Sequence, residues 1–330
     1  MIRRAAYVLP YFFEIFTVLN FVVIQWLLWR ITRAPLTTLV HVLLVFVPGF
    51  AIQAAAGVAI RALVSRRRGR YFAIIRSRQW LADTARIVIF SAFSVQTYCW
   101  IKLAVPLLHP RLFDQQLWTL DQALMFGHSP NIFLVNLFSS PAALRSVDWS
   151  YANVFYASLV LAGVFFASSP NRRVRLAFID SNIAMWLIGA WLYVLVPSLG
   201  PAFRFPDVWV PLAAMFAKTQ QMQRLLVSNY TAILKFRQGI IRPVNILFGI
   251  AAFPSLHVAF EVLVFLWMRR LWRYGEIVFG IFGVVIFIGS MVTGWHYLVD
   301  GIAGAILAAC CYVVATRQYG ITEKRFSRYA

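Results

Sequence analysis

Charged residues are scarce in this chain, and acidic residues are the scarcest. Only 13% of its 330 residues are Asp, Glu, Lys or Arg, whereas 61% are hydrophobic. A soluble globular domain is about a quarter charged and about half apolar, so the composition excludes an ordinary soluble domain. The fold class that we predict is all-α, a polytopic membrane helical bundle.

Cysteine is also rare. The three cysteines, Cys99, Cys310 and Cys311, lie in hydrophobic runs and form neither a disulfide framework nor a Cys-x-x-Cys site. The five histidines and the carboxylates show no metal-ligand spacing. We therefore expect no metal and no other cofactor.

The 31 Lys and Arg residues outnumber 11 Asp and Glu residues. In a membrane chain such an excess is typical of orientation signals and of contact with anionic lipids, which we expect as partners at the cytoplasmic face. No soluble basic face with interleaved aromatic residues is visible, so we expect no nucleic-acid partner.

Long apolar runs dominate the rest of the chain. A helix needs roughly 20 apolar residues to cross a bilayer core, and about eight such spans are present. We expect interfacial helices within 109–146, between spans three and four, and also in the long connection before span six. We divide the chain into a two-span N-terminal region with a basic loop, 1–82, and a six-span core, 83–330. The spans are 9–29, 36–64, 86–108, 149–167, 176–196, 254–268, 277–293 and 297–315.

Arginine-rich segments alternate with the spans. With about eight spans, the clusters in 66–78, 172–175, 269–273 and 317–328 fall on one side, which the positive-inside rule assigns to the cytoplasm. Both termini are then cytoplasmic. The starts of spans six and eight face the periplasmic, extracellular or lumenal side.

Two ionisable residues stand at the start of the last span. His296 and Asp300 are four apart, so on a helix they share one face and the carboxylate can reach the imidazole. A carboxylate on one ring nitrogen fixes the tautomer and aims the lone pair of the other nitrogen outward, which suits attack on phosphorus. The alternative is a polar pair that packs between helices.

A second histidine begins span six, in Pro254-Ser255-Leu256-His257. Proline favours the first turn of a helix, and the free N–H groups there, with Ser255, can hold a phosphate. His257 would then lie beside that phosphate, placed to protonate a leaving alkoxide. The alternative is an interfacial histidine in an ordinary helix start.

Together, Pro254-Ser255-Leu256-His257 and His296-x-x-x-Asp300 resemble the second and third motifs of the type-2 phosphatidic acid phosphatase superfamily. The motif sequences Phe-Pro-Ser-Leu-His and His-Tyr-x-x-Asp are most similar to those of its inositol phosphorylceramide synthase-like, or inositolphosphotransferase, branch. The resemblance implies His296 as nucleophile, Asp300 as its orienting partner and His257 as general acid and then base. It also implies metal-independent catalysis at the non-cytoplasmic end of a helical bundle.

The chain departs from this pattern in its basic residues. Lys235 to Arg242-Pro243 matches the Lys-x6-Arg-Pro spacing of the first motif, although basic loops also produce such matches by accident. The third motif usually has Ser-Arg before its histidine, whereas this chain has Gly289-Ser290. Lys102 and Arg204 are candidates to balance the phosphate charge instead, with snorkelling to the headgroups as the alternative for Lys102.

Glu261 lies one turn below His257, where it could orient that histidine or face a polar cavity. We predict a lipid phosphotransferase that takes a lipid phosphate donor and an alcohol acceptor. A lipid phosphate phosphatase, with water as acceptor, is the alternative, and a non-catalytic lipid-binding or transport protein is a further one.

Overall fold

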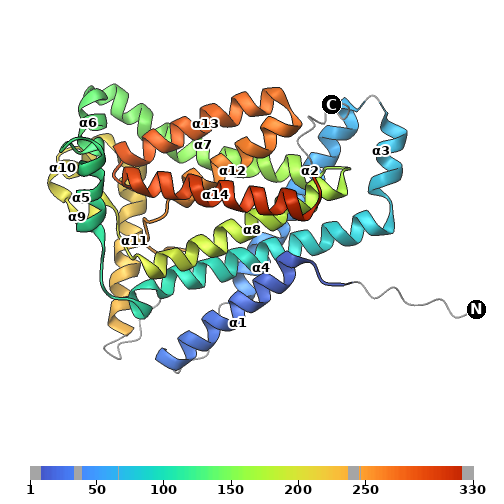
Figure 1. Ribbon diagram of the computed structural model, residues 1–330, viewed down its shortest axis with the longest axis horizontal. Coiled ribbons are helices and arrows are strands. Elements are labelled where there is room, and N and C mark those ends of the chain that lie inside the picture. Colours follow the sequence, from blue (N-terminus) through green and yellow to red (C-terminus); the bar gives the residue numbers. More distant parts are fainter. Residues whose placement is uncertain (1–8, 33–38, 66, 237–244, 246, 322–330) are drawn as a thin grey trace, which may run out of the picture.

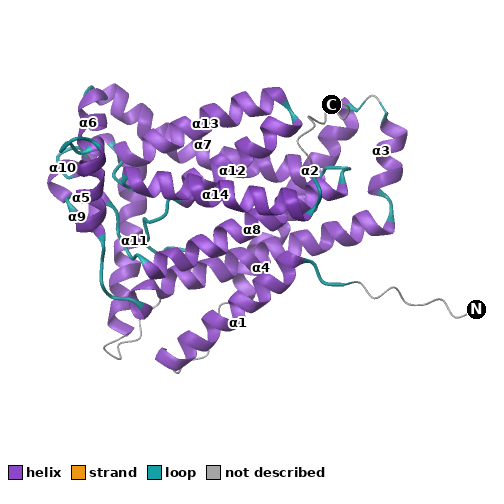
Figure 2. Ribbon diagram, in the orientation of Figure 1, coloured by secondary structure: helices purple, strands orange, loops and turns teal. Residues whose placement is uncertain are grey.

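The computed structural model describes residues 9–32, 39–65, 67–236, 245 and 247–321, and these residues form helices joined by turns and loops (Figures 1 and 2). The all-α prediction is confirmed for this part of the chain. The long helices are α1 (Phe12–Thr32), α2 (Leu39–Val64), α4 (Arg78–Leu108), α7 (Pro141–Ala167), α8 (Arg172–Leu195), α12 (Leu256–Leu271), α13 (Arg273–Val292) and α14 (Leu298–Gln318).

Each of the eight predicted spans corresponds to one of these helices. In the described residues, seven of them are long and apolar enough to cross a membrane. The remaining long helix, α12, corresponds to the sixth span and has only 16 residues, fewer than a bilayer core requires. The chain before it is a non-helical segment with Ile250 and Ala252 buried, and the Ser255 N–H donates to the Asp300 carbonyl at 2.9 Å, so α12 and α14 begin side by side.

The remaining α-helices cover the ends of the bundle. One end carries α3 (Arg68–Ile75), and the other carries α5 (Asp114–Leu124), α6 (Pro130–Leu137), α9 (Pro201–Arg204), α10 (Pro206–Trp209) and α11 (Ala217–Phe236) (Figure 1). The helices α5 and α6 lie in the segment expected to hold interfacial helices, and α11 lies in the long connection before span six.

Local sequence sets several of the helix starts. Ser129 and Ser140 each accept a hydrogen bond from a first-turn N–H, and each is followed by proline as the first helical residue. A serine N-cap before a proline is favourable because proline has no N–H to leave unpaired there. Asn171 and Ser255 cap α8 and α12 by accepting from a first-turn N–H, without a proline after them.

The two ends of the bundle differ in charge. The histidine end, at the left of Figure 1, holds the covering helices α5, α6 and α11. The starts of α12 and α14, where His257 and His296 stand, also belong to it. The arginine end contains the start of α1, the end of α14 and the arginines that flank α3, α4, α8, α12 and α13. Asp180 accepts hydrogen bonds there from the Phe13 N–H, 3.1 Å, and the Tyr319 hydroxyl, 2.6 Å. The first and last described helices therefore meet at one end.

Candidate active site

A line of three side chains connects the N-terminal ends of α14 and α12. His296 Nδ1 lies 3.3 Å from Asp300 Oδ2, and His296 Nε2 lies 3.3 Å from His257 Nδ1. Asp300 is 0% exposed and His296 is 3% exposed. With the carboxylate accepting from His296 Nδ1–H, the Nε2 atom carries the lone pair and accepts from His257 Nδ1–H.

The backbone of α14 fixes the position of Asp300. The Tyr297 N–H donates to Asp300 Oδ2 at 2.9 Å, so this oxygen binds both the helix start and the imidazole. Before this helix the chain turns tightly at Gly294, which has φ +75°, and a Cβ there would lie 2.6 Å from the Trp209 ring. Glycine is therefore required at this turn.

Two carboxylates of α5 accept hydrogen bonds from the start of α14. Asp121 accepts from the N–H groups of Leu298 and Val299 at 2.7 and 2.9 Å. Asp114, two turns earlier, accepts from the Tyr297 hydroxyl at 2.8 Å and from the N–H groups of the 199–200 loop. Burial raises the pKa of Asp121 to about 6, although the two backbone hydrogen bonds oppose this shift.

An amide of α6 completes this support. Asn131 donates from Nδ2 to the carbonyls of Met291 and His296, at 2.9 and 3.0 Å. The Trp209 indole N–H donates to the Val292 carbonyl at 2.9 Å. The turn that carries His296 is therefore bonded to α5, α6 and α10, elements that precede it by about 80 residues or more in the chain.

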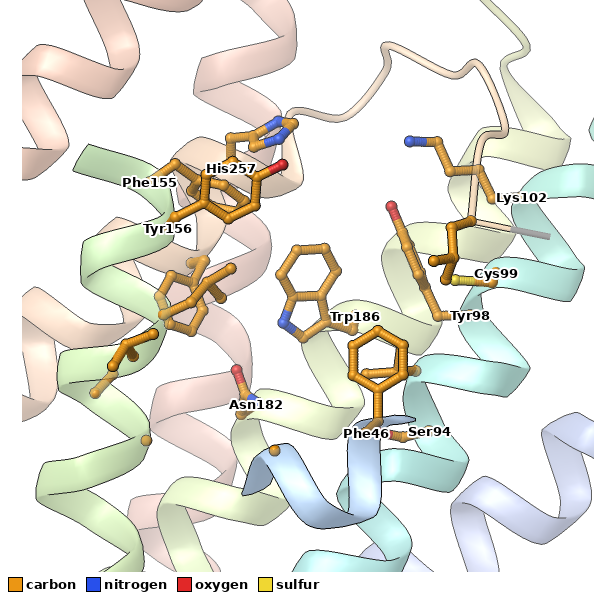
Figure 3. A pocket seen from close by; sticks show the side chains of 18 of the residues that line it. Phe46, Ser94, Tyr98, Cys99, Lys102, Phe155, Tyr156, Asn182, Trp186 and His257 are labelled. Atoms are coloured by element: carbon orange, nitrogen blue, oxygen red, sulfur yellow. The ribbon is translucent and has the colours of Figure 1, made fainter. Parts of the chain in front are cut away.

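A large cavity opens from the two histidines into the bundle. Its volume is about 830 Å³, and it lies between α2, α4, α7, α8 and the cover formed by α11 and residues 247–251. The ionisable groups His257 and Lys102 lie at the histidine end, and the deeper lining is mostly apolar, with Ser94 and Asn182 among its polar residues. Figure 3 shows His257 and Lys102 at one end, Trp186 and Tyr98 in the middle, and Phe46 and Ser94 at the other.

Lys102 is the predicted basic residue that the structure brings to this cavity. Its ammonium group points across the cavity toward His257 (Figure 3) and lies 5.9 and 5.6 Å from the ring centres of Tyr98 and Tyr193. Lys218, at the start of α11, also lines the cavity; it was not among the residues predicted for the site.

The other predicted phosphate ligands lie elsewhere. Lys235 is in the last turn of α11, roughly 25 Å along the helix from Lys218 at 1.5 Å per residue, and Arg242 lies outside the described residues. Arg204 is exposed and does not line the cavity. Ser255 is fully buried, and its hydroxyl accepts from the Val258 N–H as the cap of α12.

Glu261 is one turn below His257 but does not bond to it. Its carboxylate accepts a hydrogen bond from the Ser158 hydroxyl of α7. This contact differs from the expectation that Glu261 could orient His257, because the side chain of Glu261 is directed toward α7.

Tyr151 is a neighbour of His257 that the sequence did not single out. The ring centres of Tyr151 and His257 lie 5.8 Å apart, and Phe155, one turn along α7, packs edge-on against the imidazole at 4.3 Å. Tyr151 is 7% exposed and lines the cavity, and its hydroxyl has no hydrogen-bond partner. A buried hydroxyl without a partner is costly, which makes Tyr151 a candidate donor to a bound ligand.

The environment keeps the His296 ring neutral. Burial lowers the pKa of His296, and the Lys102 ammonium lowers it further. The imidazole is therefore neutral at pH 7. The His257 ring occupies the space beside Nε2, so a phosphorus atom can reach that nitrogen only when the two rings separate. Within the described ranges, no three His, Cys, Asp or Glu side chains could jointly hold a metal ion. The absence of a cofactor remains a prediction.

The model of the PAP2 superfamily matches residues 115–314, more than half of the chain. The chain belongs to the PAP2 superfamily. Neither the curated proteins nor the solved structures include a match. Superfamily membership supports an enzyme of the lipid phosphatase or phosphotransferase type, and the inositolphosphotransferase-like branch remains a prediction. The match begins inside α5, so α1, α2 and α4 lie outside it, and the division at residue 82 also remains a prediction.

Proposed function

We propose that this PAP2-superfamily chain is a membrane lipid phosphotransferase that acts through a phosphohistidine at His296. The observation that carries the proposal is the line Asp300–His296–His257 at the polar end of a deep apolar cavity. A lipid phosphate suits such a cavity because it joins an anionic group to a hydrocarbon chain.

In the first step, the Nε2 lone pair of His296 attacks phosphorus. The bond from phosphorus to the ester oxygen breaks, and the electron pair stays on that oxygen. His257, protonated on both ring nitrogens when the anionic phosphate is bound, supplies the proton that makes it an alcohol and is left neutral. Asp300 stabilises the positive charge that develops on the His296 ring. Separation of the two imidazoles on substrate binding gives His257 the room to face the leaving oxygen.

In the second step, an acceptor hydroxyl attacks the same phosphorus. His257, now without its proton, accepts the proton of that hydroxyl, and the electron pair of the phosphorus–nitrogen bond returns to Nε2. The burial of His296 and the apolar walls of the cavity limit the access of water. These features support an alcohol as acceptor rather than water.

The phosphate charge requires positive partners in place of the missing third-motif arginine. Lys102 and Lys218 line the cavity, and their ammonium groups can offset the charge that builds on the phosphoryl oxygens. Lys235 and Arg242 remain candidates from the sequence, with no contact in the described structure that supports them.

We place the histidine end at the non-cytoplasmic face and both termini in the cytoplasm, with anionic lipids at the arginine end. The gathering of arginines at the opposite end supports this orientation. Asp207→Cys, at the histidine end, should react with an impermeant thiol reagent outside intact cells. Arg173→Cys should react only after permeabilisation, and the reverse pattern would contradict this orientation.

The reaction type is tested by identifying products. The purified chain is supplied with lipid phosphate donors and candidate alcohols in water enriched in heavy oxygen, and lipids and phosphate are analysed by mass spectrometry. Transfer gives a phosphate ester of the supplied alcohol without the isotope, whereas hydrolysis gives labelled phosphate. His296→Ala is the control, and unchanged lipid with the wild-type chain would support a lipid-binding or transport protein instead.

A further inference from the structure

The deep part of the cavity has no role in the chemistry of the histidines. On α4 its lining extends from Lys102 to Ile87, about 22 Å of helix at 1.5 Å per residue. One leaflet of a bilayer core about 30 Å thick is about 15 Å deep. The cavity is therefore long enough to hold a lipid chain along its whole length.

One wall of this deep part comes from α2, which lies outside the residues that match the superfamily. Phe46, Gly49, Phe50 and Gln53, all on one face of the helix, line the cavity. The helix packs against α4 and α7, yet it is the least buried of the seven long apolar helices. The face of α2 that packs against other helices is therefore the one that closes the cavity.

The lining of this wall suits hydrocarbon. Phe46 and Phe50 line it together with Val95, Leu159 and Phe178 from the other helices. Few polar groups lie at this depth: Ser94 donates to the Ser91 carbonyl at 2.8 Å, Gln53 Oε1 packs against Gly163, and both Gln53 Oε1 and Asn182 Oδ1 are buried without a hydrogen-bond partner.

We infer that α2 forms the wall of a site for a hydrocarbon chain of the lipid phosphate, and that Phe46, Gly49 and Phe50 determine which chain length is accepted. This inference rests on the proposed function, because the chain site serves the lipid whose phosphate reacts at His296. The N-terminal helices thereby select the substrate, while the superfamily region carries the reacting groups.

Gly49 provides a direct way to fill the site. A Cβ built at Gly49 meets no atom within 4 Å, so Gly49→Phe places its ring in the cavity without a backbone clash. Ile52→Phe is the matched control, because Ile52 lies on the same helix but is 68% exposed on its outer face. Both variants add an aromatic ring to α2.

The test compares dioleoyl and dihexanoyl phosphatidate as donors, in the same mixed micelles. Gly49→Phe should lower kcat/KM for the dioleoyl donor by about tenfold or more, since even one methylene of misfit in an apolar pocket changes rates on this scale. The dihexanoyl rate and both rates of Ile52→Phe should stay within about twofold. A ratio of dioleoyl to dihexanoyl kcat/KM in Gly49→Phe equal to that of the wild-type chain would overturn the inference while leaving the histidine chemistry intact.

A second readout does not depend on turnover. Phosphatidate with a diazirine near the end of one chain is photolysed with the purified chain in phospholipid vesicles, and the labelled residues are mapped. Label at Phe46, Phe50 and Ser94 that excess dioleoyl phosphatidate removes would support the site even if no product forms. Label confined to outward-facing residues such as Leu44 and Ile52, unchanged in Gly49→Phe, would overturn it.

Discussion

The two ends of the bundle use their carboxylates in different ways. At the histidine end, Asp114, Asp121 and Asp148 accept hydrogen bonds from backbone N–H groups. At the arginine end, Glu14 pairs with Arg86, and Asp83 pairs with Arg172 and Arg175, while Asp180 accepts from the Phe13 N–H and the Tyr319 hydroxyl. The first arrangement fixes the backbone and leaves Lys102 and Lys218 available for a ligand, whereas the second uses its cations to join helices. Substitutions at the two ends should therefore affect different properties.

The largest effect on turnover is expected at Asp300. Asp300→Asn keeps the size of the side chain but removes the charge that fixes the His296 tautomer and stabilises its cation. We expect kcat to fall by on the order of 10⁴-fold, the scale seen when an orienting carboxylate is removed from a catalytic triad. Steady-state kinetics with a lipid phosphate would measure this loss, and a loss below tenfold would assign Asp300 a purely structural role.

Asp121 should have the next largest effect, although it does not touch the substrate. Asp121→Ala leaves the N–H groups of Leu298 and Val299 without their acceptor, which costs about 1–2 kcal/mol as for other lost helix caps and releases the turn that holds His296. We expect kcat to fall while KM changes little. Asp207→Ala, an exposed carboxylate on α10, is the control, and equal kinetics in the two variants would remove Asp121 from the positioning of His296.

Removing the Lys102 ammonium should shift the pH profile. The ammonium lowers the pKa of His296, so Lys102→Gln should raise that pKa. Since the neutral imidazole is the nucleophile, the acid limb of kcat/KM should move to higher pH. Comparison with the wild-type chain on one substrate cancels the ionisation of the substrate, and an unshifted acid limb would separate Lys102 from His296.

At the arginine end, Asp83→Asn should change turnover least. Arg175 has a 0% exposed side chain 3.6 Å from Asp83, and a buried charge that loses its partner destabilises a fold by about 3–5 kcal/mol. We expect lower thermal stability in detergent, with kcat per folded molecule unchanged. A change in kcat that matches Asp300→Asn would contradict the division of roles between the two ends.

The sequence predicted the eight long helices from runs of apolar residues, most of them about as long as a bilayer crossing requires. It also predicted that His257, His296 and Asp300 lie together, because motif spacing and the count of spans place them at one end. The partners of the His296 turn could not be predicted. Asp114, Asp121 and Asn131 bond to backbone groups about 85 to 180 residues away, and no local pattern encodes such contacts.

The basic residues near the cavity could not be predicted from the sequence either. Lys235 fits a spacing pattern, yet α11 continues as a straight helix that separates it from Lys218 and the cavity. Lys102 has no motif around it, and its position follows from the packing of α4 against α8. Its side-chain direction therefore depends on tertiary structure.

The central claim is that His296 carries the phosphoryl group, and trapping that group tests it most directly. A donor labelled on phosphorus is mixed with the chain, quenched rapidly in base, digested and analysed by mass spectrometry. We predict an acid-labile, base-stable phosphoryl adduct on His296, absent from His296→Ala. An adduct on another residue, or full turnover by His296→Ala, would contradict the account.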